Sequence, residues 1–170
     1  RALPAQVDPL RRVRGFREMA QIVSQARTQL EQEGTPVFVI GDHYGITSLL
    51  TFYQPEARER VKKSPIVFFQ SSSEPKNQYY FWPSYTTNCV GQNALYVRDC
   101  GLPKLAASWF PRWLTGQTNL YAPDTLPEAA PPPPWLTGQF QSVTNLGIFD
   151  VQMRGQVLHR IEIFACRNLR

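Results

Sequence analysis

The chain has 170 residues, of which 42% are hydrophobic and 18% charged, which is typical of one folded domain rather than of a disordered segment. Its 18 Lys and Arg residues outnumber its 13 Asp and Glu residues, but no nucleic-acid motif accompanies the net charge of +5, so no nucleic-acid partner is expected. No apolar run approaches the roughly 18 residues of a membrane span, so the chain as given is expected to be soluble.

The N-terminal part predicts a helix followed by a buried strand. Gly34 and Pro36 are typical of a helix end, and the continuously apolar stretch 37–40 is typical of a strand buried on both faces of a parallel sheet. The helix is expected over 13–30, because apolar side chains recur there at three- and four-residue spacing: Phe16, Met19, Ala20, Val23, Ala26 and Leu30.

A second helix and two further strands are predicted next. The helix covers 46–53 and is expected to stop around Pro55. The strands cover 66–69 and 94–97, and between them lie a polar loop, 71–77, and an aromatic stretch, "QYYFWP".

The section 101–137 has a different character, because a proline run, "PPPP", cannot form regular hydrogen-bonded structure and is expected to be extended. The pentapeptide Trp-Leu-Thr-Gly-Gln occurs twice, starting at Trp113 and at Trp135. Two copies are too few for a repeat architecture. Each tryptophan is expected to anchor a long loop to the core, and contact with a partner is the alternative.

The tail predicts an antiparallel hairpin, with arms over 141–153 and 156–166 around Arg154-Gly155. Together these elements predict a single α/β domain over residues 1–170: a small, mostly parallel sheet flanked by helices, with the antiparallel C-terminal hairpin at its edge and a Pro-rich insertion at about 101–137.

The three cysteines do not indicate a metal centre. Cys89, Cys100 and Cys166 have no CxxC spacing, and the chain has only two histidines to join them. No metal and no cofactor is therefore expected. A bridge between Cys89 and Cys100 stays possible, with free structural thiols as the simpler expectation.

A polar cleft is predicted at the carboxyl edge of the sheet, where ligands of open α/β sheets usually bind. If the first two strands are parallel neighbours, the segments that follow them meet there. The candidate ligand-binding residues offer a carboxylate, an imidazole, amides and stacking faces, which suit a sugar or a polar headgroup: Asp42, His43, Tyr44, Asn77, Gln78, Tyr79 and Trp82.

A structural role for the same residues is the competing interpretation. Asp42 would cap the second helix, His43 would be an exposed loop residue, and the aromatic side chains would belong to the core. No catalytic residue is assigned, because adjacent Asp42 and His43 do not by themselves make a dyad and no GxSxG or phosphate-loop pattern is present.

Several segments nevertheless resemble one family. "DPLRRVRGFREMAQIV" (8–23) looks like the opening that follows the last membrane span in bacterial transferases of glycosyltransferase family 39, which includes relatives of protein O-mannosyltransferases and of the aminoarabinose transferase. "GDHYGITSLLTFYQP" (41–55), "KNQYYFWP" (76–83), "GQNALYVRD" (91–99) and the tail 153–169 are similar to later family segments, in the same order. His43 stands where the family usually has Arg, and Tyr80 where it has Asp.

The resemblance implies a function as part of a larger enzyme. The chain would be the C-terminal periplasmic domain of an inner-membrane or plasma-membrane glycosyltransferase that uses a polyprenyl-phosphate-linked sugar donor and a hydroxyl acceptor. Its partners would be its own transmembrane domain and the membrane surface, and it would help to position the acceptor or the donor headgroup. The catalytic carboxylate of such enzymes lies in their membrane part, so this domain would not catalyse transfer alone. Arg1 in place of Met fits such an excised piece.

The alternative is a freestanding α/β enzyme, or a binding protein for a small polar ligand.

Overall fold

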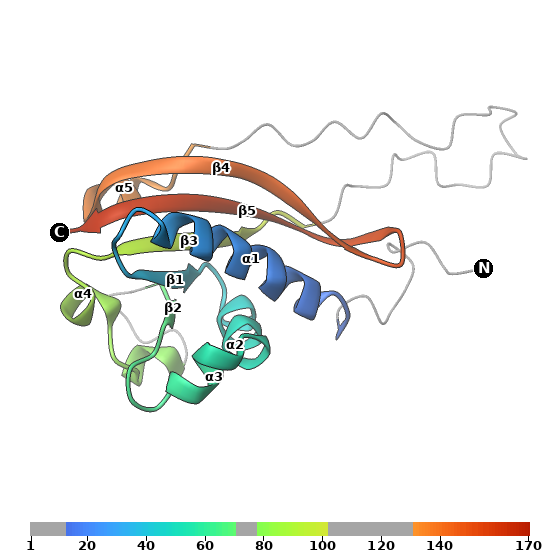
Figure 1. Ribbon diagram of the computed structural model, residues 1–170, viewed down its shortest axis with the longest axis horizontal. Helices are drawn as coiled ribbons and strands as arrows, with labels where there is room; N and C mark the ends of the chain where they lie inside the picture. The colour runs from blue at the N-terminus through green and yellow to red at the C-terminus, as the bar shows by residue number, and fades with distance from the viewer. Residues whose placement is uncertain (1–12, 71–77, 102–130) are drawn as a thin grey trace, which may run out of the picture.

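Three parallel strands form one side of a five-stranded mixed sheet (Figure 1). The computed structural model describes residues 13–70, 78–101 and 131–170. The strand order is β2-β1-β3-β5-β4, in which β2 (Val67–Phe69), β1 (Val37–Gly41) and β3 (Asn93–Asp99) are parallel. The antiparallel hairpin of β4 (Phe140–Met153) and β5 (Gln156–Leu169) completes the sheet beside β3. The predicted fold class is thereby confirmed.

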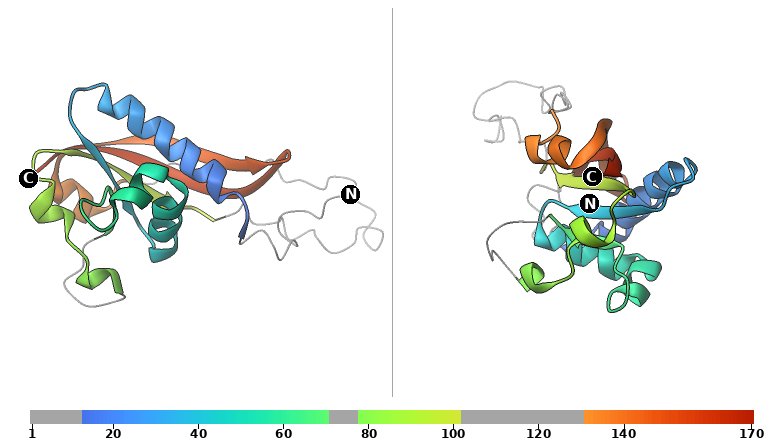
Figure 2. Two further views of the ribbon diagram at one scale, coloured as in Figure 1. Left: turned by 60° about the horizontal axis from the view of Figure 1, so that its bottom comes forward. Right: turned by 90° about the vertical axis from the view of Figure 1, so that its left-hand side faces the viewer.

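Helices cover both faces of this sheet. α1 (Phe16–Glu31) lies along one face, and α2 (Tyr44–Tyr53) and α3 (Pro55–Arg60) follow beside it (Figure 1). The opposite side carries α4 (Tyr85–Asn88) and α5 (Pro134–Gln139), and Figure 2 shows α1 and α5 on opposite sides of the sheet. A 3-10 helix, η2 (Gln78–Phe81), precedes α4. Within the three described ranges, no helix is long and apolar enough to cross a membrane.

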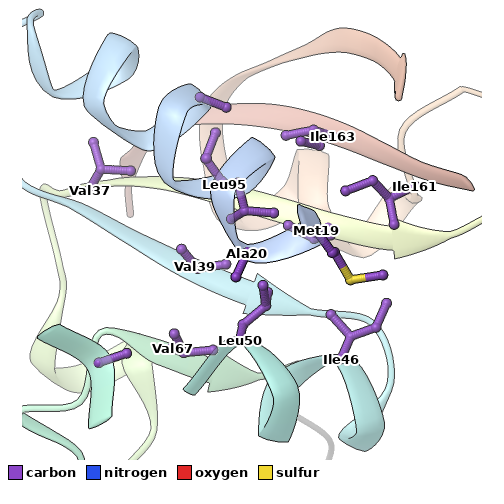
Figure 3. Packing of buried hydrophobic residues seen from close by; sticks show 14 of the residues in the cluster. Met19, Ala20, Val37, Val39, Ile46, Leu50, Val67, Leu95, Ile161 and Ile163 are labelled. Carbon is purple, nitrogen blue, oxygen red and sulfur yellow. The ribbon is translucent and has the colours of Figure 1, made fainter. Parts of the chain in front are cut away.

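The first face of the sheet holds the larger hydrophobic core. Met19, Ala20 and Val23 on α1 meet Ile46 and Leu50 on α2, over side chains of β1, β2, β3 and β5 (Figure 3). The apolar spacing that predicted α1 is the reason, because residues three and four apart lie on one face of a helix. This burial positions α2 against the carboxyl end of β1.

The second face holds an aromatic core. The ring of Phe38 contacts those of Phe68, Tyr85 and Phe140. Two helices cover this cluster, α4 through Tyr85 and α5 through Leu136. Val39 belongs to the first core, whereas its neighbours Phe38 and Ile40 belong to the second. β1 is thus buried on both faces, as its unbroken apolar run predicts.

The C-terminal hairpin turns where the sequence predicts. Met153 pairs with Gln156, and the two residues between them, Arg154 and Gly155, both have positive φ. This is the backbone of a type I′ turn, whose twist matches that of the flanking strands. Both arms are one residue or more longer than expected, since β4 begins at Phe140 and β5 ends at Leu169.

Two helix predictions need correction. Pro55 ends α2, as expected, but it also opens α3 as its first residue, a position where the missing N–H is not needed. The stretch 134–137, assigned to an extended insertion, is the start of α5. There Trp135 packs edge-on against Tyr96, with ring centroids 5.3 Å apart, whereas Trp113 lies outside the described residues.

The cysteines are free thiols. Cys89 and Cys100 precede and follow the seven residues of β3, which at about 3.3 Å per residue hold them far beyond the roughly 7 Å limit for a disulfide. Cys166 is buried in the aromatic core. The possible Cys89–Cys100 bridge is therefore absent.

Candidate functional site

The parallel strands bring the predicted segments to one edge of the sheet. Gly41 is in register with Phe69 of β2 and with Val97 of β3, so the chain leaves all three strands on the same side. On this edge β1 is followed by Asp42 and His43, and β3 ends at Asp99. This is the edge at which ligands of open α/β sheets bind.

The turn from β1 into α2 is tight because of a glycine. A Cβ atom at Gly41 would lie 2.5 Å from Thr47 Oγ1 and 3.0 Å from the Thr47 backbone nitrogen. Thr47 is fully buried, so it has little room to move away. Only glycine therefore permits α2 to start this close to the strand.

His43, rather than Asp42, caps α2. The extended backbone of His43 places its Nδ1 atom 3.1 Å from the Gly45 amide, which donates to it. With Nδ1 accepting, the ring hydrogen of the neutral imidazole is on Nε2. The ring also contacts Tyr44, with centroids 4.1 Å apart. The helix end thus fixes both side chains.

Asp42 faces the end of β3 instead. Its Oδ2 atom accepts from the Asp99 amide at 3.1 Å, and its Oδ1 atom is buried without a hydrogen-bond partner among the described residues. Burial raises the pKa of the Asp42 carboxyl to about 6, and the amide of Asp99 and the charges of His43 and Arg98 offset only part of that rise. A carboxyl that titrates near neutral pH at a sheet edge is a typical functional-site candidate.

A hydrogen bond joins the two motifs that the sequence placed after successive strands. Ser48 lies one turn after Tyr44 on the outer side of α2, and its Oγ atom is 2.5 Å from the Tyr79 hydroxyl on η2. The Tyr79 ring lies over Phe69 at 5.9 Å and contacts Trp82 at 5.0 Å. The segment after β2 is thus held against the helix after β1.

An aromatic surface results. Tyr44, Ser48 and Phe52 are spaced four apart on α2 and all face outward. On η2 and just after it, Phe81 is 81% exposed and Trp82 40% exposed. We call the exposed or half-exposed rings of α2 and this segment the aromatic surface: Tyr44, Phe52, Tyr79, Tyr80, Phe81 and Trp82.

The predicted cleft residues therefore form two groups. Asp42 and His43 are bound to backbone amides at the sheet edge, whereas Tyr79 and Trp82 are in contact with each other beside α2. Tyr44 connects the groups, since its ring contacts His43 and it shares the outer side of α2 with Ser48. Gln78 is exposed at the start of η2, and Asn77 lies outside the described residues.

One residue of this edge was not among the predicted site residues. His159 on β5 lines a pocket of about 300 Å³ together with His43, Asp99 and Phe16. Its ring stacks on Phe16 at 5.0 Å, and its Nε2 atom lies 2.8 Å from the Arg14 carbonyl oxygen. Both histidines of the chain therefore line one pocket, although they are far apart in the sequence. No local pattern around His159 signals this.

A buried ion pair on the second face was also missed. Glu162 on β5 is 1% exposed and accepts from Arg98 of β3 and, at 2.7 Å, from the amide of Asn145 on β4. Arg160 on the same strand is buried and pairs with Asp150 of β4 at 2.6 Å. The only signal in the sequence is a charged residue at alternate positions of an otherwise apolar strand.

No protein-family model, curated protein or solved structure matches this chain. The residues themselves also give no metal centre, because no three His, Cys, Asp or Glu side chains of the described ranges are grouped to hold an ion.

Proposed function

We propose that this chain is the extracytoplasmic C-terminal domain of an integral-membrane glycosyltransferase that uses a polyprenyl-phosphate-linked sugar donor. The domain helps to position the hydroxyl acceptor or the donor headgroup, on the periplasmic side, and it does not catalyse the transfer alone. The proposal rests on the ordered resemblance of five segments to that enzyme family. Its own transmembrane part and the membrane surface are the partners it would have.

The observation that carries the proposal is the Ser48–Tyr79 hydrogen bond. Ser48 belongs to the family-like segment 41–55 and Tyr79 to the family-like segment 76–83, so two of the five segments that resemble the family are in contact. The parallel pairing of β1 and β2 brings the two segments to one edge of the sheet. Their meeting point lies beside the edge where α/β sheets bind ligands.

The aromatic surface suits a sugar-bearing ligand. Flat rings such as Trp82 offer apolar faces for the C–H groups of a sugar ring, while the Gln78 amide and the tyrosine hydroxyls offer hydrogen bonds. Tyr79 is fixed by Ser48, Phe69 and Trp82, so little side-chain entropy is lost on binding.

The same geometry argues against bond-making chemistry by Asp42 and His43. The two side chains accept hydrogen bonds from different amides, those of Asp99 and Gly45, and so do not form a dyad with each other. A nucleophile needs its base within hydrogen-bond reach. A positioning role fits them better than a catalytic one.

The reading frame upstream of Arg1 tests the proposal directly. Several hundred preceding residues with apolar spans of about 20 residues would support it. A start codon or signal peptide close to Arg1 would refute it.

In the full-length enzyme, Gln78→Ala and Trp82→Ala should each lower sugar transfer at unchanged protein level in the membrane. Val90→Ala is the matched control, because Val90 is also exposed but lies outside the aromatic surface. Wild-type transfer by all three variants would remove the positioning role.

A freestanding enzyme or small-ligand protein is the second candidate. Two observations favour this function. His43 and His159 line one pocket, and the Asp42 carboxyl next to His43 has a pKa raised to about 6. The same upstream reading frame decides between the two.

A further inference from the structure

A second pocket lies at the opposite edge of the sheet, where the parallel strands begin. Figure 1 shows α4 at this end of the sheet. It has a volume of about 330 Å³, within the usual range for small-molecule sites. We call it the amino-end pocket. Its walls are the starts of β1 and β2, the chain between α3 and β2, and the segment from α4 to β3.

The floor of the amino-end pocket is apolar. Phe38 and Phe68 line it from neighbouring strands, and their rings meet edge to face at 5.6 Å. Cys89 adds a buried thiol, and burial raises the pKa of this thiol, which keeps it neutral. The floor can therefore bury an aromatic or aliphatic group but offers no charge to it.

Cations stand along one wall. Arg27, Arg60 and Lys63 line the pocket, and no carboxylate is among its lining residues. Each of the three guanidinium nitrogens of Arg27 already donates to one partner, namely the Val37 carbonyl oxygen, Glu56 or Glu31, at distances of 2.7 to 2.8 Å. Arg27 therefore supports the wall rather than offering donors to a ligand.

Arg60 and Lys63 have N–H donors that make no hydrogen bond to a described residue. Arg60 uses Nε for Ser64, at 3.2 Å, and one terminal nitrogen for Glu56, at 2.8 Å, so its second terminal nitrogen is uncommitted among the described residues. The Lys63 ammonium pairs with no described residue. Both Glu56 oxygens already accept from arginines, so Glu56 does not compete for Lys63.

Amide groups stand on the other wall. Asn88 at the end of α4 and Gln92 before β3 line the pocket, and neither side chain hydrogen-bonds to another described residue. Amide N–H groups and cations together are the donors that bind carboxylates and phosphates in proteins.

We propose that the amino-end pocket binds a small organic anion, a carboxylate or phosphate monoester with an apolar body. Lys63, Arg60 and the two amides would receive the anionic group, and Phe38 and Phe68 would pack against the apolar body. The Arg27–Glu56 ion pair ties α1 to α3, and the Arg60–Glu56 pair lies within α3, so the two arginines are held in place before binding. The proposal does not depend on the glycosyltransferase assignment.

Titration calorimetry on the full 170-residue chain tests this site with four probes: phenyl phosphate, benzoate, inorganic phosphate and benzyl alcohol. Phenyl phosphate and benzoate should bind saturably, and each should weaken as salt is added. Inorganic phosphate lacks the apolar body and benzyl alcohol lacks the charge, so each should bind at least about tenfold more weakly than phenyl phosphate. The proposal would be overturned if all four probes bound with equal affinity, or if no probe bound.

Charge-matched variants locate the site. Lys63→Gln should weaken phenyl phosphate binding about five- to tenfold, the value of one charge-assisted hydrogen bond. Lys62→Gln removes the same charge one residue away, outside the pocket lining, and should leave the affinity unchanged. Asn88→Asp, which places a carboxylate on the opposite wall, should abolish binding. An equal effect of Lys62→Gln and Lys63→Gln would mean that only net charge attracts the probe.

Discussion

At the scale of single residues, Asp42 shows how a fold changes the chemistry of a side chain. An aspartate after a strand and before a helix is a common helix cap, and here it is not one. Its Oδ2 atom accepts from Asp99 while its Oδ1 atom is buried without a partner among the described residues. His43 takes the capping role instead. The neighbour strand β3, not the adjacent helix, decides the environment of Asp42.

The raised pKa of Asp42 makes stability depend on pH. Because the folded-state pKa, about 6, lies above the value of an unfolded aspartate, the folded chain binds more protons between about pH 4 and pH 6. The contribution of Asp42 to stability should therefore fall as pH rises through this window and stay low above it. Asp42→Asn should remove this dependence and gain about 1 to 3 kcal/mol relative to the wild type between pH 4 and pH 8.

Denaturant unfolding of both proteins across that range measures the effect. The informative quantity is the difference between the two stability curves, since other groups titrate in both. A difference that stays constant from pH 4 to pH 8 would show that Asp42 does not titrate in this window.

Among the elements, α2 has one buried side and one exposed aromatic side. α2 buries Ile46 and Leu50 against the first core, while Tyr44 and Phe52 face outward. Its amphipathic pattern predicts the helix and its buried side, but an exposed aromatic stripe has the same composition as core. The interpretation that the aromatic side chains of the predicted cleft belong to the core is thus wrong for Tyr44, because η2 covers only the middle of the outer side of α2, through Ser48.

β5 is buried on both faces, which its sequence indicates only in part. Ile161 and Ile163 pack into the first core, whereas Phe164 and Cys166 belong to the second. The charged residues between them are tolerated because β3 and β4 supply partners, Arg98 and Asn145 for Glu162. Partners on other strands cannot be found from the alternation of one strand.

Removing Glu162 should destabilise the domain strongly. Glu162→Ala leaves Arg98 without its counter-ion and Asn145 without its acceptor, so the free energy of unfolding should drop by about 3 kcal/mol or more. Glu56→Ala is the control, because it also removes two arginine contacts but from an exposed carboxylate, and its effect should be much smaller. Chemical denaturation measures both; equal losses would show that burial does not matter here.

At the scale of the whole molecule, the sheet separates two candidate sites. The carboxyl edge carries Asp42, His43 and the aromatic surface, and the amino edge carries the pocket with Lys63. Parallel strands create this separation, because all three begin at one edge and end at the other (Figure 1). A ligand at one edge can thus be tested without disturbing the other.

The rates at which the cysteines are alkylated measure the unfolding of the whole domain. Cys100 is half-buried beside Glu162, whereas Cys166 is fully buried, which raises the pKa of its thiol to about 12. In the native protein near pH 8, an alkylating reagent should modify Cys100 first, and Cys166 only when the domain unfolds. Mass spectrometry after timed labelling resolves the three sites. Modification of Cys166 as fast as Cys100 would contradict the packing of β5.

The local elements and the fold class can be predicted from the sequence alone. Apolar periodicity defined α1, the unbroken apolar runs defined β1 and β3, and Arg154-Gly155 defined the hairpin, because these signals depend only on neighbouring residues. The sequence also predicted that the segments after β1 and β2 meet at one edge, since parallel strands require it.

Which side chains share an environment depends on the tertiary fold. It turned Asp42 toward β3, joined Ser48 to Tyr79, placed His159 in the pocket of His43, and assembled the amino-end pocket from four separate segments. Each of these contacts joins residues that lie far apart in the chain. No local pattern encodes them, because they depend on how the sheet brings distant elements together.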